Sequence, residues 1–543
     1  MKNKIITLLI AALSTTWLLT SCNDYLDVTP DNRTEIDTED KVGLLLAGSY
    51  PDNTYAPMIN PRIDNVTDKN TGTESGAQTN RDAFFWRDGE TQTRQDSPAQ
   101  VWVALWHSIA GANGALDAIE LLGGADRSEK LSAYQGEALT LRAFCHFILA
   151  CCYSPLYDLS EPAKNGTNLG LPYITEQETE INKQYERGNV EELWSSIQKD
   201  LEEGLKRIAP VSKGISTYHF NPNAAYAFAT RFYLYKGDYA KVIEMANRVI
   251  PQPALDPETE AVALEDPATT FVKNNFQDWP GALQSMSSST DIKIAFNSTS
   301  NPSILLLSDV ASDIASRTNS WRYATSDPDL DRTVSAQNPT GATFAYKIFH
   351  SGDWNYYIPK FQSYFKTTTV NASTGVYHAA YPWLRMEEIL INRAEAYALS
   401  GDTLRAVADL NLFCRTRIVN YNERSHSLTL AKITSFYRAL INDPEFYMNK
   451  YNAMGAQSWT LKQKALVHFI LLCRQNEFIH ESLRYWDMIR YKMPCTHTTN
   501  PQAGGESNTL YPGDDRWVIQ VPDNVVLAGM ELNPRTNILS PQW

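Results

Sequence analysis

The chain has 543 residues and a formal net charge of −14 at pH 7. An acidic protein is repelled by the phosphates of nucleic acid, so this balance gives no support for a role in binding DNA or RNA. Beyond the first residues, no stretch stays apolar for the roughly 20 residues that a membrane-spanning helix needs.

The N-terminus reads as a targeting segment. Lys2 and Lys4 precede an uncharged, mostly apolar run, which ends in Leu-Thr-Ser directly before Cys22. Small residues before a cysteine match the bacterial lipobox, in which the thiol is acylated and the chain is cut in front of it. We therefore predict a lipoprotein signal peptide at residues 1–21 and lipidation of Cys22, which would be the only membrane anchor. The alternative is an ordinary signal peptide with a chance cysteine.

Apolar residues recur at helical spacing in several long segments. These segments are residues 101–122, 134–153, 190–208, 221–250, 383–414 and 461–491. Two of them contain a Gly-Asp pair, so we expect residues 221–250 to split into two helices at 236–238, and residues 383–414 to split at 400–402.

The two Gly-Asp segments also resemble each other. Tyr233, Gly237 and Asp238 align with Tyr397, Gly401 and Asp402, and a basic residue follows three positions later in both. A helix, a tight turn and a second helix form the tetratricopeptide plan, in which hairpins stack because none can bury its apolar face alone. The alternative is two chance hairpins. We predict a mostly α fold with a tetratricopeptide-like helical hairpin scaffold.

Long polar connections interrupt the helices. Residues 51–100 and 251–381 are rich in Asn, Asp, Ser, Thr and Pro, with scattered aromatics. Connections of this length are usually functional loops or small insertions, and we expect them to carry little β structure. We predict one domain at 22–543, made of an N-terminal helical part (22–250), a loop-rich insertion (251–380) and a C-terminal helical part (381–543).

Three motifs follow one another along the chain. Residues 22–30 read Cys-Asn-Asp-Tyr-Leu-Asp-Val-Thr-Pro, residues 141–144 read Leu-Arg-Ala-Phe, and residues 474–490 contain Arg, Glu, Glu and Arg-Tyr-Trp-Asp-Met-Ile-Arg. In this order they resemble the SusD/RagB family of surface nutrient-binding lipoproteins. The chain departs from the family pattern where Ser482 replaces a glycine, where Trp486 stands one place late, and where the final Gln-Asn-Pro-Gly is missing.

Alternating charges mark the last of these segments. Glu477, Glu481, Arg484, Asp487 and Arg490 are spaced three or four residues apart. On one continuous helix such residues lie on neighbouring turns and form a ladder of charge pairs. We interpret this ladder as structural, and the alternative is a catalytic acid cluster.

The sequence offers no catalytic or metal-binding motif. It lacks His-Glu-x-x-His, Gly-x-Ser-x-Gly, a P-loop and any Cys-x-x-Cys pair. Asp327, Asp329 and Asp331 alternate like the start of a calcium loop, but Arg332 stands where such a loop needs glycine. We therefore predict no catalytic residue, no metal and no cofactor.

Aromatic residues beside Asp, Asn or Arg in the polar connections are candidates for recognising a sugar, whose ring has apolar C–H faces and a hydroxyl edge. The candidate ligand-binding residues are Asp64, Asp68, Trp86, Arg87, Trp321, Arg322, Trp354, Tyr356 and Tyr357. The alternative for each aromatic is that it pins its own loop to the helices.

The family resemblance implies a function. Such proteins lie at the outer membrane, face the cell exterior, bind glycans and act as the lid of a SusC-like TonB-dependent transporter. It implies a binding protein and no enzyme. The alternatives are a peptide-binding RagB-type subunit, a surface glycoside hydrolase and a purely structural lipoprotein.

Overall fold

The computed structural model describes residues 36–70, 78–88, 95–178, 183–210, 215–253, 288–319, 321–325, 333–350, 356–369 and 372–540. The predicted lipidation site at Cys22, the candidate Trp354 and the acidic turn at residues 327–331 lie outside these residues.

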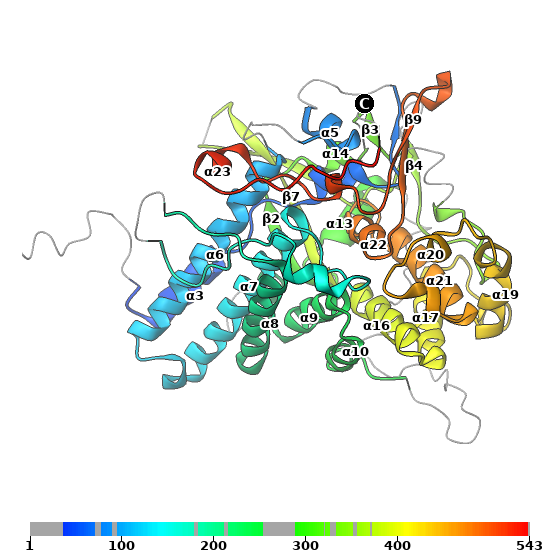
Figure 1. Ribbon diagram of the computed structural model, residues 1–543. Helices are drawn as coiled ribbons and strands as arrows, with labels where there is room; N and C mark the ends of the chain where they lie inside the picture. The colour runs from blue at the N-terminus through cyan, green and yellow to red at the C-terminus, as the bar shows by residue number, and fades with distance from the viewer. Residues whose placement is uncertain are drawn as a thin grey trace, which may run out of the picture.

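The larger helices form one array, and all but those at residues 39–47 and 430–441 lie in segments that the sequence predicts to be helical. They are α3 (Glu39–Ala47), α6 (Pro98–Leu121), α7 (Glu129–Tyr153), α8 (Val190–Arg207), α9 (Pro222–Lys236), α10 (Tyr239–Asn247), α16 (Met386–Ser400), α17 (Thr403–Arg417), α19 (Leu430–Ile441), α21 (Leu461–Glu477) and α22 (Leu483–Arg490). Helix α7 packs on α6 and α8, α10 packs on α9 and α16, and α16 packs on α17 and α21. In Figure 1 the array fills the lower part of the molecule.

Both Gly-Asp turns form as predicted. Gly237 ends α9 and Gly401 ends α16, each in the left-handed conformation with φ of 78° and 86°. Asp238 and Asp402 then cap α10 and α17, because their side chains accept hydrogen bonds from the backbone N–H groups of Lys241 and Arg405. The two hairpins stack through α10 and α16, which confirms the helical-hairpin scaffold.

Short helices and strands complete the fold. The helices are α4 (Ala56–Ile59), α5 (Gln78–Phe84), α13 (Ser289–Asn297), α14 (Ile314–Asn319), α18 (Glu423–His426), α20 (Tyr447–Lys450) and α23 (Asp523–Leu527). The strands are β1 (Thr67–Asp68), β2 (Ile304–Val310), β3 (Tyr323–Ala324), β4 (Phe349–His350), β5 (Tyr356–Tyr357), β6 (Ser363–Thr367), β7 (Gly375–Arg385), β8 (Cys495–Thr498) and β9 (Ser507–Leu510). They form an antiparallel sheet of order β2-β7-β6 and the two-stranded pairs β1-β3, β4-β5 and β8-β9, so the prediction of little β structure is confirmed.

The helix predicted to begin at residue 383 begins later. Strand β7 continues to Arg385, which pairs with Ile304 of β2, and α16 starts at Met386. Trp383 and Leu384 are therefore buried residues of a strand, and a short apolar run does not distinguish a buried strand from a helix.

The prediction of one continuous helix over residues 461–491 is wrong. Helix α21 ends at Glu477 and α22 starts at Leu483, with His480 and Ser482 both in the left-handed region at φ of 67° and 65°. The predicted charge ladder is also mostly wrong. Among its five residues, only Asp487 and Arg490 pair with each other, at 2.7 Å. The break turns the remaining charges toward other elements.

The array and the loops share a hydrophobic core. Tyr55 from the first polar connection packs its ring 5.6 Å from Trp383 of β7 and 4.6 Å from Trp486 of α22. All three side chains are nearly inaccessible to solvent, so the loop-rich side is fixed to the helices. The six cysteines among the described residues are buried and unpaired.

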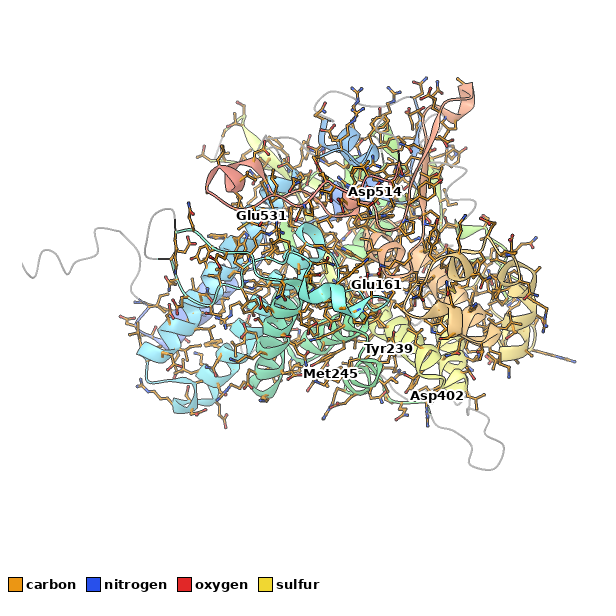
Figure 2. The ribbon with its side chains drawn as sticks, viewed as in Figure 1. Glu161, Tyr239, Met245, Asp402, Asp514 and Glu531 are labelled. Carbon is orange, nitrogen blue, oxygen red and sulfur yellow. The ribbon has the colours of Figure 1, made fainter. Side chains whose placement is uncertain are left out.

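The helical edge and the C-terminal segment lie on different sides of the molecule. Met245 in α10 and Asp402 at the α16–α17 turn lie at the bottom of the view, and Asp514 and Glu531 lie well above them (Figure 2). In the part of the chain that the structure describes, no helix combines the length and apolarity required to cross a bilayer.

Candidate ligand-binding face

Two loops that are far apart in the sequence meet in the β1–β3 pair. Thr67 lies opposite Ala324, Asp68 lies opposite Tyr323, and the N–H of Lys69 donates to the carbonyl of Arg322. This pairing brings the predicted residues near position 68 beside those near position 322. Figure 1 shows α5, α14, β3 and β4 at the top of the molecule, away from α10 and α16. We call this side the loop face.

Asp68 is a structural carboxylate. It is 1% exposed and accepts from Nε and Nη2 of Arg322, at 2.6 and 3.0 Å. The backbone N–H groups of Asn70 and Asn500 donate to its two oxygens, at 2.9 and 3.1 Å. Asp68 therefore ties β1, β3 and the loop at Asn500 together. The Arg322 side chain stays 24% exposed.

Trp86 belongs to a stack of four buried rings. Its indole lies 4.3 Å from the ring of His497, which lies 4.4 Å from Phe84, and Phe84 lies 4.6 Å from Tyr323. Trp86 is 1% exposed and donates its indole N–H to the carbonyl of Arg62. Its ring offers no free face to a ligand, and we leave it out of the proposed contact residues.

His497 is a residue that the sequence reasoning missed. Its Nδ1 lies 2.7 Å from the carbonyl of Phe84 and its Nε2 lies 2.9 Å from that of Ile63. Burial lowers the pKa of His497 to about 4, although the two carbonyl contacts oppose this shift. The alternation of His497 with buried Cys495 in a short strand was a signal, but nothing local to it indicated the partner rings.

Asp64 and Arg87 keep part of their polar surface in solvent. Asp64 accepts from Nε and Nη2 of Arg484, at 3.1 and 2.6 Å, and its side chain is 27% exposed. The guanidinium of Arg87 lies 4.7 Å above the ring of Phe85. Both side chains can offer hydrogen bonds at the surface of the loop face.

Trp321, Tyr356 and Tyr357 lie near α14. Arg317 of that helix places its guanidinium 4.0 Å from the Trp321 ring, and this arginine also pairs with buried Asp96. Trp321 is only 7% exposed. Tyr356 and Tyr357 are half-buried in β5, which packs against α14, so these two tyrosines are the more accessible aromatics.

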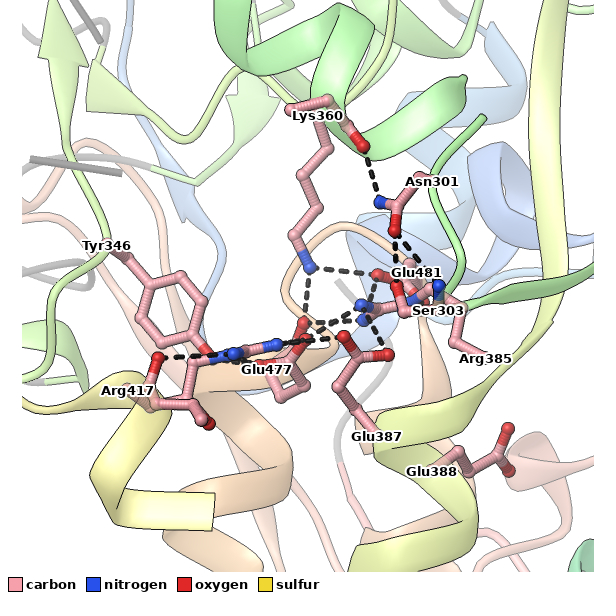
Figure 3. Close-up of polar contacts among 12 residues, drawn as sticks. Asn301, Ser303, Tyr346, Lys360, Arg385, Glu387, Glu388, Arg417, Glu477 and Glu481 are labelled. Carbon is pink, nitrogen blue, oxygen red and sulfur yellow. Dashed lines mark hydrogen bonds and ion pairs between the residues drawn. The ribbon is translucent and has the colours of Figure 1, made fainter. Parts of the chain in front are cut away.

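A buried charge network includes Lys360, which follows β5 by three residues in the chain (Figure 3). The Lys360 ammonium donates to Glu481 at 2.8 Å, and the N–H of Ile358 donates to Nε2 of His480. Arg385 and Arg417 donate to Glu477, each at 2.7 Å. Burial alone would raise the pKa of Glu477, but Arg417 and Arg385 outweigh burial and lower it. The network anchors the backbone that carries Tyr356 and Tyr357.

The described residues contain no group of three or more His, Cys, Asp or Glu side chains that could hold a metal ion. The buried acids of the network contact Arg, Lys or Tyr side chains and are closed to solvent. The arrangement suits binding through partly exposed polar and aromatic groups on a rigid base.

The fold and this face define a helix-rich protein with a loop-built side that carries partly exposed polar and aromatic groups, and comparisons with known proteins give its family. Residues 24–234 match a family model described as starch-binding and associating with outer membrane, and residues 347–525 match the model of the SusD family. The chain belongs to the SusD/RagB-like family.

Solved structures share the fold. A SusD-like carbohydrate binding protein from Bacteroides vulgatus is 16% identical, with 92% of this chain and 97% of that chain covered and a TM-score of 0.60. A SusD superfamily protein from Bacteroides thetaiotaomicron is 16% identical, with 92% and 100% covered and a TM-score of 0.60. One from Bacteroides fragilis is 16% identical, with 90% and 98% covered and a TM-score of 0.58. The comparison with curated proteins finds no match.

Proposed function

We propose that this protein is held at the outer membrane by acyl chains on Cys22 and binds glycans at the cell surface through its loop face. It then delivers them to a SusC-like TonB-dependent transporter, for which it acts as the lid. Residues 22–543 act as one domain in this role, and the protein has no catalytic activity of its own. Family membership supports the glycan ligand and the outer-membrane location.

The observation that carries the proposal is the composition and support of the loop face. Partly exposed Arg87 and Arg322 adjoin α5 and β3, partly exposed Asp64 shortly precedes β1, which pairs with β3, and the half-buried Tyr356 and Tyr357 form β5, which pairs with β4. Tyrosine rings can pack on the C–H faces of a sugar, and the charged groups can hydrogen-bond its hydroxyls. The ring stack and the charge network preorganise these groups, which lowers the entropic cost of binding.

The test is retention of the mature protein in native gels containing immobilised polysaccharides, with casein peptides in a parallel gel. We expect retention by at least one polysaccharide and none by peptides. The double variant Tyr356→Ala/Tyr357→Ala should weaken binding by about tenfold, because each lost aromatic contact costs about 0.5–1.5 kcal/mol. Retention by peptides alone would instead identify a RagB-type peptide binder.

A matched control is Phe436→Ala in α19, which removes a 41% exposed aromatic from the helical array. It should leave retention unchanged. Release of reducing sugar by the purified protein would overturn the non-catalytic role in favour of a glycoside hydrolase. Failure of a barrel protein to co-purify from native membranes would overturn the lid role.

A further inference from the structure

A cleft opens along α6, and its lining residues are separate from the candidate residues of the loop face. Its volume is about 560 Å³, and α6, residues 172–178, Tyr185 and the α23 segment line it. Ligand sites typically enclose about 300–1,000 Å³. None of the candidate residues of the loop face lines this cleft, so it requires its own explanation.

Two tryptophans of α6 form one wall. Trp102, Trp106, Ile109 and Asn113 follow one another at intervals of three or four residues, so they lie along one helix face. The two indole rings lie 5.7 Å apart at an interplanar angle of 56°. Trp102 packs edge-on against Tyr153 at 5.0 Å, which holds its ring in place.

The facing wall, residues 172–178, is fixed by buried polar groups. Nδ1 of His146 lies 2.9 Å from the carbonyl oxygen of Arg142, and its Nε2 accepts a hydrogen bond from the N–H of Ile174 at 3.1 Å. The side-chain amide of Asn113 donates to the carbonyl of Glu176 at 3.1 Å, and Arg142 donates to the oxygen of that amide at 2.8 Å. The cleft is therefore preformed.

The polar groups of the cleft determine which ligand fits. Glu176, Gln177, Glu178 and Asn524 line it, and no Lys or Arg is among its described lining residues. The indole N–H of Trp106 is buried and has no hydrogen-bond partner among the described residues. That donor is closed to solvent, so the carboxylates and amides are the groups of the cleft that can hydrogen-bond hydroxyls or an ammonium group.

We propose that this cleft is a second carbohydrate site, and that it takes neutral or amino-sugar units and rejects acidic ones. The partly exposed Trp106 ring, packed on buried Trp102, supplies the apolar platform, and the two glutamates repel carboxylate or sulfate groups. The inference rests on the proposed glycan-binding function and extends it, because a second site lets one long chain engage the protein twice. Double engagement raises the avidity for long glycans.

The experiment uses mature protein labelled with 5-fluorotryptophan and observed by ¹⁹F NMR. The probes are cellohexaose, chitosan hexamer and hexagalacturonate, and the variants Trp102→Phe, Trp106→Phe and Trp321→Phe assign the resonances. We expect the Trp102 and Trp106 resonances to shift saturably with the neutral or the amino-sugar probe and not with hexagalacturonate. Trp459, which does not line the cleft, provides the reference resonance.

A second measurement tests the platform ring. Trp106→Ala removes this ring, so it should weaken binding at this cleft by about three- to tenfold, the range of one lost aromatic contact. Unshifted Trp102 and Trp106 resonances, with a shifted Trp321 resonance or retention on polysaccharide, would overturn this inference and leave the proposed function standing. If, in addition, the Trp321 resonance did not shift and no polysaccharide retained the protein, the proposed function would be overturned as well. An equal response to hexagalacturonate would overturn the stated specificity.

Discussion

Arg417 and Glu477 form a fully buried ion pair, with 2.7 Å between Nε and Oε2 and side chains at most 1% exposed. They lie on α17 and α21, 60 positions apart in the chain. Glu477 also binds Arg385 at the end of β7, and Arg417 also binds Glu387 of α16 at 2.8 Å. One carboxylate therefore joins the helical array to the sheet (Figure 3).

Replacing Glu477 by glutamine should destabilise the protein strongly. Removing one partner of a buried ion pair typically costs about 3–5 kcal/mol, because the opposite charges stay buried without compensation. Glu477→Gln leaves the positive charges of Arg385 and Arg417 buried without the carboxylate that both of them contact. We expect a loss of this size in the free energy of unfolding, measured by urea denaturation.

The control is Glu423→Gln, which breaks the surface pair with Arg415, where Glu423 is 49% exposed. Exposed pairs contribute about 0–1 kcal/mol, so this variant should stay close to the wild type. Equal effects of the two substitutions would contradict a central role for the network.

His146 should make stability fall with decreasing pH. Burial lowers the pKa of His146 to about 3, against about 6.5 in an unfolded chain. Between these values the unfolded state binds the extra proton, so this contribution is complete above pH 6.5 and declines by about 1.4 kcal/mol per pH unit below it.

His146→Gln removes this titration. Between pH 6 and pH 4 the unfolding free energy of the variant should fall less steeply than that of the wild type. The two slopes should differ by about 1.4 kcal/mol per pH unit, whatever the absolute stability of the variant. Above pH 7 the two curves should run parallel. Identical slopes below pH 6 would show that His146 binds its proton equally in both states.

Gly136 in α7 should not tolerate alanine, although alanine is the better helix former by about 1 kcal/mol. A Cβ at this position would lie 2.5 Å from the backbone nitrogen of Ile208, which follows α8. We expect Gly136→Ala to lower stability by about 1–3 kcal/mol, as overpacking does, in thermal unfolding. Gly166→Ala is the matched control, since nothing lies within 4 Å of its Cβ position. A stabilised Gly136→Ala protein would refute the close approach.

Asp68→Asn should loosen the loop face without unfolding the array. The variant loses the negative charge that accepts hydrogen bonds from Arg322 and from two backbone N–H groups. A hydrogen bond to a charged group contributes about 1.5–3 kcal/mol. Hydrogen exchange at Lys69 and Asn500 should therefore accelerate by about 10–100-fold. The control is Asp126→Asn, because the Asp126 side chain is 88% exposed and pairs with Arg207. It should leave the exchange rates of the Lys69 and Asn500 amides unchanged. Unchanged exchange rates in Asp68→Asn would contradict the structural role of Asp68.

Local pattern predicted the elements whose causes are local. The Gly-Asp turns at residues 237 and 401 formed as expected because glycine alone enters the left-handed region freely and aspartate caps the next helix. The break at His480 and Ser482 escaped prediction because both are non-glycine residues at positive φ. Only the surrounding contacts, such as the bond from the Ser482 hydroxyl to the carbonyl of Ala56, hold them there.

The sequence by itself determined the helical hairpins, their turns and the resemblance to the SusD/RagB-like family, since these depend on spacing and on ordered motifs. Tertiary structure alone decided which polar residues serve packing. Trp86 and Asp68 entered the interior because the ring of His497 and the guanidinium of Arg322 reach them from distant segments. Burial is a property of the assembled neighbours, and no single segment encodes it.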